Sequence, residues 1–150
     1  MQNIPFEVIG LQADGFHIIT EVEIFEKKFK MVIDTGASKT VLDKETLLNS
    51  GINEEEFLIT DILSTGLGTN NMQSFMITIP LMKLSDWSTR NFTAAVLDLS
   101  SINFAYSQIG LDPVIGVLGG DILQLFGAKI DYKKNTLTLN QRKLNLNNLR

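Results

Sequence analysis

Met31-Val32-Ile33-Asp34-Thr35-Gly36-Ala37-Ser38 is the stretch of sequence that decides the fold. In it an apolar run leads directly into an acidic residue, a hydroxyl residue and a glycine, and a short extended piece follows at 40–42. Asp and Gly are common in ordinary turns for local reasons, so Asp-Thr-Gly alone is a weak signal. Its meaning depends on the chemistry that an aspartate can perform and on what the rest of the chain contains.

Asp34 is the candidate catalytic residue. Hydrolysis of a peptide bond without a metal ion or a covalent nucleophile needs one group that deprotonates water and one that protonates the carbonyl oxygen. Two neighbouring carboxylates can do both, because like charges so close cannot both ionise and the pair therefore shares one proton. Gly36 keeps the loop open to the substrate backbone, and the Thr35 hydroxyl can bond across to a partner loop. Because the chain contains a single Asp-Thr-Gly, such a pair requires two chains.

The composition argues against most other kinds of catalytic or binding site. The chain has 150 residues, of which 44% are hydrophobic, and these values predict one folded domain over 1–150. The net charge of −4 argues against nucleic-acid binding, and no apolar run approaches the ~18 residues of a membrane span. With no cysteine and one histidine, His17, the sequence predicts neither a metal site nor a cofactor. His17 lies in an alternating stretch, where we expect an ordinary strand residue with one face toward solvent.

Strand-like segments dominate the chain. We expect strands over the ranges 16–25, 29–33, 40–42, 58–63, 72–84, 92–97, 114–118, 129–132 and 136–139. Short helices are expected over 44–49 and 120–126, and a third should begin at Ser101 as its cap. Many short strands and few helices predict an all-β barrel or sandwich. The core should span about 16–140, followed by a tail over 141–150.

Taken together, these segments resemble the retropepsins, the single-motif aspartic proteases of retroviruses and their cellular and bacterial relatives. The loop from Asp34 to Ser38 is similar to the active-site loop of that family, and Gly116-Val117-Leu118-Gly119-Gly120-Asp121-Ile122-Leu123 is similar to its second landmark. Between them, Gly66-Leu67-Gly68-Thr69 matches the tip of the family's flap, and 98–103 is similar to the bacterial members in particular. The resemblance covers about 18–139. It implies a closed or partly open acid-protease barrel with one or two short helices and a flap hairpin.

The resemblance also implies a role for each matching position. Asp34 would share a water and a proton with Asp34 of a second subunit, Thr35 would form a lock between the subunits, and Gly36 would contact substrate. The other matching positions would complete the loop (Ala37, Ser38), close over the substrate as a flap (Gly66, Leu67, Gly68, Thr69) or pack beneath the loop and hold it (Val117, Leu118, Gly119).

The chain departs from the family at two points. Viral members often pair an acidic residue at the position of Ser38 with an arginine at that of Gly120. Neither charge exists here, so the dimer must be held differently, and the leucine-rich tail over 142–150 is the candidate, as a strand with one apolar face; a frayed terminus fits it nearly as well. Ala37 stands where pepsin-type loops carry a hydroxyl that stabilises the ionised carboxylate. The shared proton should therefore be held more tightly, which predicts a mildly acidic pH optimum.

The sequence thus predicts a homodimeric aspartic endopeptidase that cleaves extended peptides with apolar side chains beside the scissile bond. Its partners would be a second copy of itself and a peptide or protein substrate, with no nucleic acid and no membrane span. The main alternative is a catalytically silent or regulatory peptide-binding module with the same fold; a more remote one is an unrelated β-barrel in which Asp34 only ends a strand. The compartment would be the cytoplasm if Met1 is the native start, and the periplasm or the exterior if an export signal was removed.

Overall fold

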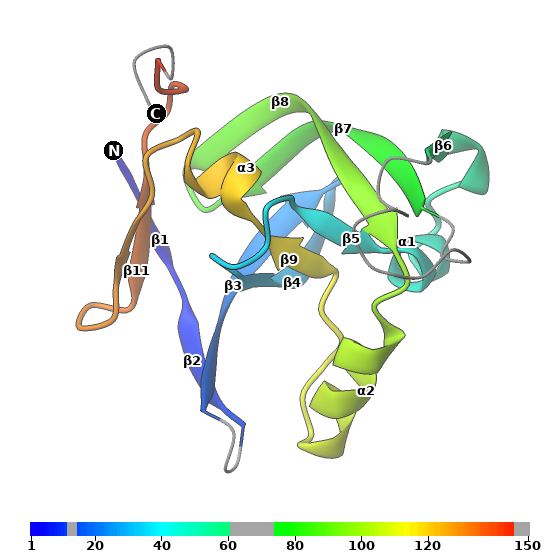
Figure 1. Cartoon of the computed structure of the whole chain (residues 1–150), viewed down its shortest axis with the longest axis horizontal. Helices are drawn as coiled ribbons and strands as arrows, with labels where there is room; N and C mark the ends of the chain where they lie inside the picture. Colours follow the sequence, from blue (N-terminus) through cyan, green and yellow to red (C-terminus); the bar gives the residue numbers. More distant parts are fainter. Residues whose placement is uncertain (12–14, 61–73, 146–150) are drawn as a thin grey trace.

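The strands of the computed structural model, which describes residues 1–11, 15–60 and 74–145, form two sheets (Figure 1). The larger sheet runs in the order β2 (Glu7–Gly10), β3 (Phe16–Ile24), β4 (Lys27–Ile33), β9 (Gly116–Leu118), β5 (Val41–Asp43), β8 (Trp87–Leu97), β7 (Ser74–Leu84) and β6 (Leu58–Thr60). β3 also pairs with β7, where Glu23 faces Lys83, so the six strands from β3 to β7 close into a barrel. The prediction of an all-β closed barrel is therefore confirmed.

The two landmark segments of the sequence meet at the centre of this barrel. β4 and β9 pair in parallel, which places Val32 beside Val117 and Ile33 beside Leu118. On its other side β9 pairs with β5 in the antiparallel sense. Because β9 has a neighbour on each side, the apolar run over 114–118 is buried throughout, as its composition predicts.

The smaller sheet joins the two ends of the chain in the order β1 (Gln2–Pro5), β11 (Thr136–Leu139) and β10 (Lys129–Asp131). Gln2 faces Leu139 and Pro5 faces Thr136 in an antiparallel ladder. Ile4 of β1 is fully buried, so the packed core begins well before residue 16. β1 and β2 were not predicted from the sequence, because each is four residues long and gains its order from a partner elsewhere in the chain. The hairpin of β10 and β11 was predicted correctly.

Three α-helices and one 3-10 helix occur among the described residues: α1 (Lys44–Asn49), α2 (Ser100–Gln108), α3 (Gly120–Leu123) and η1 (Glu54–Glu56). α1 has the predicted bounds, and the side chain of Asp43 caps it by accepting from the N–H of Thr46. The predicted cap of α2 is wrong, because Ser101 lies inside the helix. The turn before α2 is instead closed by Asp98, and hydrogen bonds from the hydroxyl and the N–H of Ser100 hold the pKa of that carboxyl below its ordinary value. Every helix in the described ranges is too short or too polar to cross a membrane.

Trp87 is a core residue that no local pattern of the sequence singles out. It begins β8 and is fully buried. Its ring meets that of Phe126 edge to face, with centroids 4.9 Å apart, and its Nε1 donates to the carbonyl of Asn140 at 2.9 Å. Trp87 therefore fastens the chain after β11 to the barrel. Phe75 also packs in the core, against Phe57.

The predicted flap and tail lie largely outside the described residues. β6 and β7 pair as the two arms of the predicted flap, with Leu58 facing Met76, but Gly66, Leu67, Gly68 and Thr69 fall in the range that the structure does not describe. The tail is described as far as Asn145 and contains no strand to that point. The tail is hydrogen-bonded to the same chain: the N–H of Leu144 donates to the carbonyl of Leu125 at 2.7 Å.

Candidate active site

Asp34 lies at the end of β4, where the strand leaves the barrel. Its N–H donates to the carbonyl of Leu118 at 2.9 Å, which extends the parallel pairing of β4 and β9 by one residue. The side chain is partly exposed, whereas Ile33 before it is buried. The strand pairing therefore fixes the backbone of the aspartate and leaves its carboxylate open to a ligand.

The loop after Asp34 turns back onto the carboxylate. The N–H of Gly36 donates to Oδ1 of Asp34 at 2.9 Å, and the N–H of Ala37 donates to the Asp34 carbonyl at 3.2 Å. A Cβ atom at Gly36 would lie 3.3 Å from the same Oδ1, so the glycine leaves space beside the carboxylate. Thr35, Gly36 and Ser38 are exposed, and Ala37 is partly buried. The outer side of the loop is thus free to meet substrate or another subunit.

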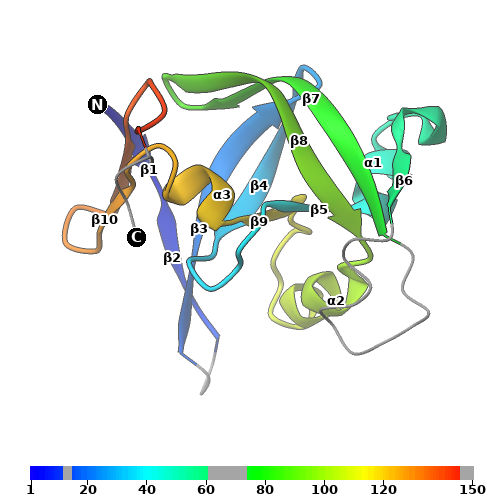
Figure 2. The ribbon, with the colours of Figure 1, turned by 45° about the horizontal axis from the view of Figure 1, so that its top comes forward.

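The far end of this loop lies beside α3 (Figure 2), and a hydrogen-bonded brace holds it there. Thr40 is fully buried, and its N–H and hydroxyl donate to the carboxylate of Asp121 at 2.7 to 3.0 Å. The same hydroxyl accepts from the N–H of Gly119 at 3.1 Å. Asp121, which belongs to the second landmark of the sequence, thus joins α3 to the loop.

Two glycines allow the loop and β9 to approach each other. A Cβ atom at Gly116 would lie 1.9 Å from the carbonyl oxygen of Val41, and one at Gly119 would lie 2.5 Å from the carbonyl of Lys39. These distances leave no room for any side chain. The glycines of the second landmark are therefore needed for close packing of two backbone segments.

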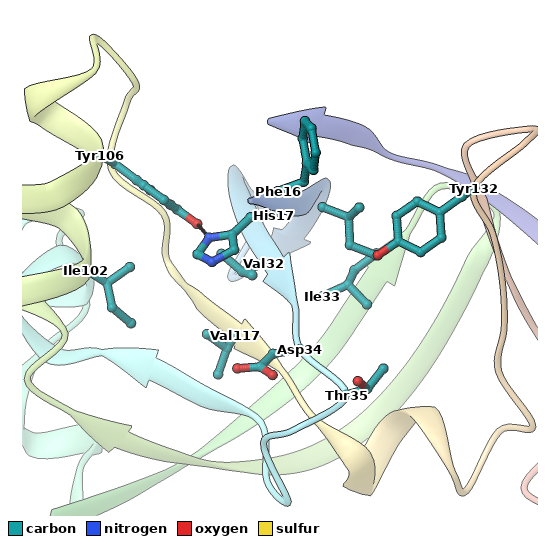
Figure 3. Close-up of a pocket in the computed structure, with 11 residues that line it drawn as sticks. Phe16, His17, Val32, Ile33, Asp34, Thr35, Ile102, Tyr106, Val117 and Tyr132 are labelled. Atoms are coloured by element: carbon teal, nitrogen blue, oxygen red, sulfur yellow. Dashed lines mark hydrogen bonds between the residues drawn. The ribbon is translucent and has the colours of Figure 1, made fainter. Parts of the chain in front are cut away.

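Asp34 lies in the wall of a pocket with a volume of about 260 Å³ (Figure 3). Figures 1 and 2 show the hairpin of β2 and β3 and the helix α2 projecting from the same side of the barrel, and both contribute to the pocket. Its lining is mostly apolar or aromatic and includes Phe16, Val32, Ile102, Val117 and Tyr132. The polar groups are those of Asp34, Thr35, His17, Tyr106 and the hydroxyl of Tyr132.

His17 and Tyr106 form a hydrogen-bonded pair across this pocket. Nδ1 of His17 lies 2.6 Å from the hydroxyl of Tyr106, although the residues are 89 positions apart. Burial raises the pKa of the Tyr106 phenol, and the negative charge of Asp34 raises it further. His17 is an exposed strand residue, as the sequence predicts. Its place in the pocket was missed, because sequence alone does not show which residues α2 brings to β3.

Buried polar contacts fix the position of α2. The side-chain amide of Asn103 donates to the carbonyl of Val114 at 3.2 Å, and its oxygen accepts from the N–H of Val114 at 2.8 Å. The buried carboxylate of Asp43 accepts from the N–H of Leu99 at 2.9 Å. Asp43 and Asn103 thereby hold the helix that carries Ile102 and Tyr106 into the pocket. Neither residue was singled out from the sequence, since Asp and Asn at such positions also occur in ordinary turns.

Solved structures with the same fold come from bacteria, a protozoan and a retrovirus. A retropepsin-like aspartic protease from Rickettsia conorii is 24% identical, with a TM-score of 0.55, and the match covers 92% of this chain and 87% of that one. The retroviral protease-like domain of Ddi1 from Leishmania major is 17% identical, with a TM-score of 0.57 and coverage of 99% and 100%. EIAV protease, solved with an inhibitor, is 23% identical, with a TM-score of 0.54 and coverage of 82% and 99%.

These likenesses establish the acid-protease barrel as the fold. No curated protein sequence matches the chain significantly. The profile of the family described as aspartyl protease matches residues 20–122, well over half of the chain, and includes both Asp34 and Asp121. The chain belongs to the aspartyl protease family and has the retropepsin-like fold.

Proposed function

We propose that this protein is a homodimeric aspartic endopeptidase whose active site contains Asp34 from each of two subunits. The observation that carries the proposal is the position of the Asp34 carboxylate, which is partly exposed in the wall of a largely apolar pocket and held by its own loop. Each chain has one Asp-Thr-Gly, so one chain supplies only half of a carboxylate pair.

The chemistry follows from bringing two such carboxylates together. One shared proton leaves one carboxyl group as the acid and the other as the base. The base takes a proton from a water held between them, the water attacks the peptide carbonyl, and the acid protonates the carbonyl oxygen. The exposed hydroxyl of Thr35 would bond to the partner's loop and hold the two carboxylates in register. Val117, Leu118 and Gly119 would support the loop from beneath.

The substrate would be an extended peptide that lies along the pocket as an added strand. The apolar wall formed by Val32, Ile102 and Val117 favours apolar side chains beside the scissile bond. The segment that contains Gly66, Leu67, Gly68 and Thr69 would close over the peptide and exclude water. The tail after Asn145 remains a candidate for part of the dimer contact.

The test combines a peptide library with sedimentation of the same samples. The wild-type protein should sediment as a dimer and cleave peptides in a pepstatin-sensitive manner. Asp34→Asn should remain a dimer and lose activity by a factor of about 10² to 10⁴ or more, because the shared proton is lost. Asp112→Asn, which changes an exposed turn aspartate in the same way, should keep wild-type activity.

Two results would contradict the proposal. A wild-type protein that stays monomeric at high micromolar concentration would exclude a pair of Asp34 residues. A stable dimer that binds peptides but cleaves none would instead indicate the silent peptide-binding module.

A further inference from the structure

The one imidazole of the chain lies in the pocket that contains Asp34. His17 belongs to β3 and Tyr106 to α2, and the two rings meet edge to face with centroids 5.8 Å apart. Figure 3 shows the imidazole held by the Tyr106 hydroxyl at one end of the pocket, with Asp34 and Val117 on the opposite side. The peptidase mechanism does not use this pair, so its presence beside the reacting groups needs a separate reason.

A Tyr106 hydroxyl that donates to Nδ1 of His17 would fix which imidazole nitrogen carries the hydrogen. The residue is 2% exposed, and the raised pKa of its phenol keeps the hydroxyl protonated over the working range of an aspartic protease. A buried phenol needs an acceptor, and Nδ1 of His17 lies 2.6 Å away. When Nδ1 accepts this bond, the neutral ring carries its hydrogen on Nε2. Protonation of the ring keeps a hydrogen there, so Nε2 is a donor in both states.

The surroundings make this donor selective. Apart from its polar groups, the pocket is lined by Val32, Ile102, Val117 and other apolar side chains. When a ligand fills the pocket, the Nε2–H of His17 loses its hydrogen bond to water. A purely apolar ligand offers no acceptor to replace that bond. Sites of this kind discriminate against analogues that lack the matching polar group.

We propose that this pocket takes a substrate side chain that ends in a hydrogen-bond acceptor, with glutamine as the neutral example, and that His17 Nε2–H is the donor. Tyr106 acts as a positioning residue, because it fixes the ring without touching the substrate. The inference deepens the proposed function and rests on it, since it concerns the substrate of the same site. It adds one polar requirement to a cleft whose other contacts are apolar.

Glutamine and methionine form a matched pair for the test, because they have similar length and differ in the acceptor. Starting from the best-cleaved library peptide, each position from four before to four after the scissile bond is changed in turn to Gln and to Met. At one position we expect kcat/KM to favour Gln by roughly threefold to tenfold. His17→Leu should abolish that preference, and Tyr106→Phe should reduce it. Tyr132→Phe, which removes the other phenol of the same pocket, should keep the wild-type ratio.

A binding measurement separates failure of this inference from failure of the proposed function. The same peptides are titrated onto Asp34→Asn, alone and combined with His17→Leu. If peptides are cleaved but no position favours Gln, or the preference survives His17→Leu, the inference is wrong and the peptidase stands. If no library peptide is cleaved, the same Gln and Met series is built on the library peptide that binds Asp34→Asn most tightly. A Gln preference in binding that depends on His17 then means that the peptidase fails and the inference holds. If nothing is cleaved and binding shows no preference for Gln either, both the proposed function and this inference are overturned.

Nuclear magnetic resonance tests the role of Tyr106 directly. The chain has one histidine, so ¹⁵N labelling of histidine gives a single pair of ring signals. At a pH where those signals show a neutral ring, the wild-type protein should have its hydrogen on Nε2, and Tyr106→Phe should give a mixture of both tautomers. A wild-type ring with its hydrogen on Nδ1 would present an acceptor to the pocket and would overturn the proposal.

Discussion

At the scale of single residues, the site depends on glycines, which have no side chain, as much as on the charged Asp34. The backbone of Val41 and Lys39 lies directly over Gly116 and Gly119, closer than any Cβ atom allows. Gly36 lies beside the carboxylate of Asp34, and its N–H donates a hydrogen bond to that carboxylate. Bare backbone at these positions lets the loop close on itself and on β9 with its hydrogen bonds made.

Gly116→Ala should therefore destabilise the protein strongly. The new methyl group would meet the Val41 carbonyl oxygen at 1.9 Å, and forcing β5 and β9 apart should cost about 3 kcal/mol or more in the free energy of unfolding. Urea denaturation measures the loss. Gly10→Ala is the matched control, because its Cβ would meet only the ring of Phe16 at 3.7 Å, and its change should stay within about 0.5 kcal/mol. Equal effects of the two substitutions would contradict this account of Gly116.

Ala37→Ser should shift the pH optimum of cleavage toward acid. A hydroxyl at this position would stabilise the ionised carboxylate, so the pair that shares one proton would persist to lower pH. The pH profile of kcat/KM measures the shift. Ala37→Cys is the control, since a thiol has a similar size but is a weak donor. An optimum that already lies at strongly acidic pH in the wild-type protein would refute the underlying prediction.

Tyr106 should ionise only above its ordinary pKa of 10.0, because burial and the charge of Asp34 both favour the neutral phenol. In Tyr132→Phe it is the remaining tyrosine of the two, so phenolate absorbance reports on it alone. A raised pKa in the folded state means that its contribution to stability is complete below pH 10 and is lost as the pH rises through the folded value. The melting temperature should fall over that same range. Ionisation at or below the value of the denatured protein would contradict the prediction.

At the scale of elements, a polar contact joins the loop over 34–40 to α3. A buried threonine lies between a carboxylate and a backbone N–H and bonds to both. The side chains of Asp43 and Asn103 likewise hold α2 in place through hydrogen bonds to backbone groups. Short elements with little apolar surface of their own are thus placed by a few satisfied polar groups.

Thr40→Val tests the first of these contacts, because it keeps the shape of the side chain and removes the hydroxyl. The N–H of Gly119 and one oxygen of Asp121 would each lose a partner, which should cost about 1 to 3 kcal/mol. Cleavage activity should fall as well, since the loop that carries Asp34 is loosened. Thermal unfolding and kcat measure the two effects.

Thr78→Val is the control for this change. Thr78 lies on β7, and its hydroxyl bond to Thr93 is exposed to solvent, so its loss should change stability by no more than about 0.5 kcal/mol. Should Thr40→Val prove equally mild, the brace would not be what positions the loop.

At the scale of the whole molecule, the active site that we propose belongs to two chains. Mixing wild-type protein with Asp34→Asn tests this prediction, because we expect the substitution to leave the dimer intact. After exchange at equal concentrations, about half of the wild-type subunits remain in wild-type pairs, so activity per wild-type chain should fall to about half. The same amount of Asp112→Asn should leave activity per active site unchanged. A mixture that keeps full activity per wild-type chain would show that one Asp34 suffices.

The features that the sequence predicted correctly are those that neighbouring residues determine. Strand β4, the apolar strand over 114–118 and helix α1 each have a local pattern that specifies their structure. Features that arise from contacts between distant segments were not predicted. His17 and Tyr106 are 89 positions apart, and Thr40 and Asp121 are 81 apart. Neither pairing leaves a trace in local periodicity, and β1 likewise becomes a strand only because β11 lies beside it.

The burial of Trp87 has a practical consequence for optical spectroscopy. As the single indole of the chain, it lies in the core against Phe126 and away from the cleft. Its fluorescence should emit at short wavelength in the native state and should remain unchanged when a peptide enters. A red shift would then report that the barrel has come apart from the chain that follows β11, independently of whether the cleft is occupied.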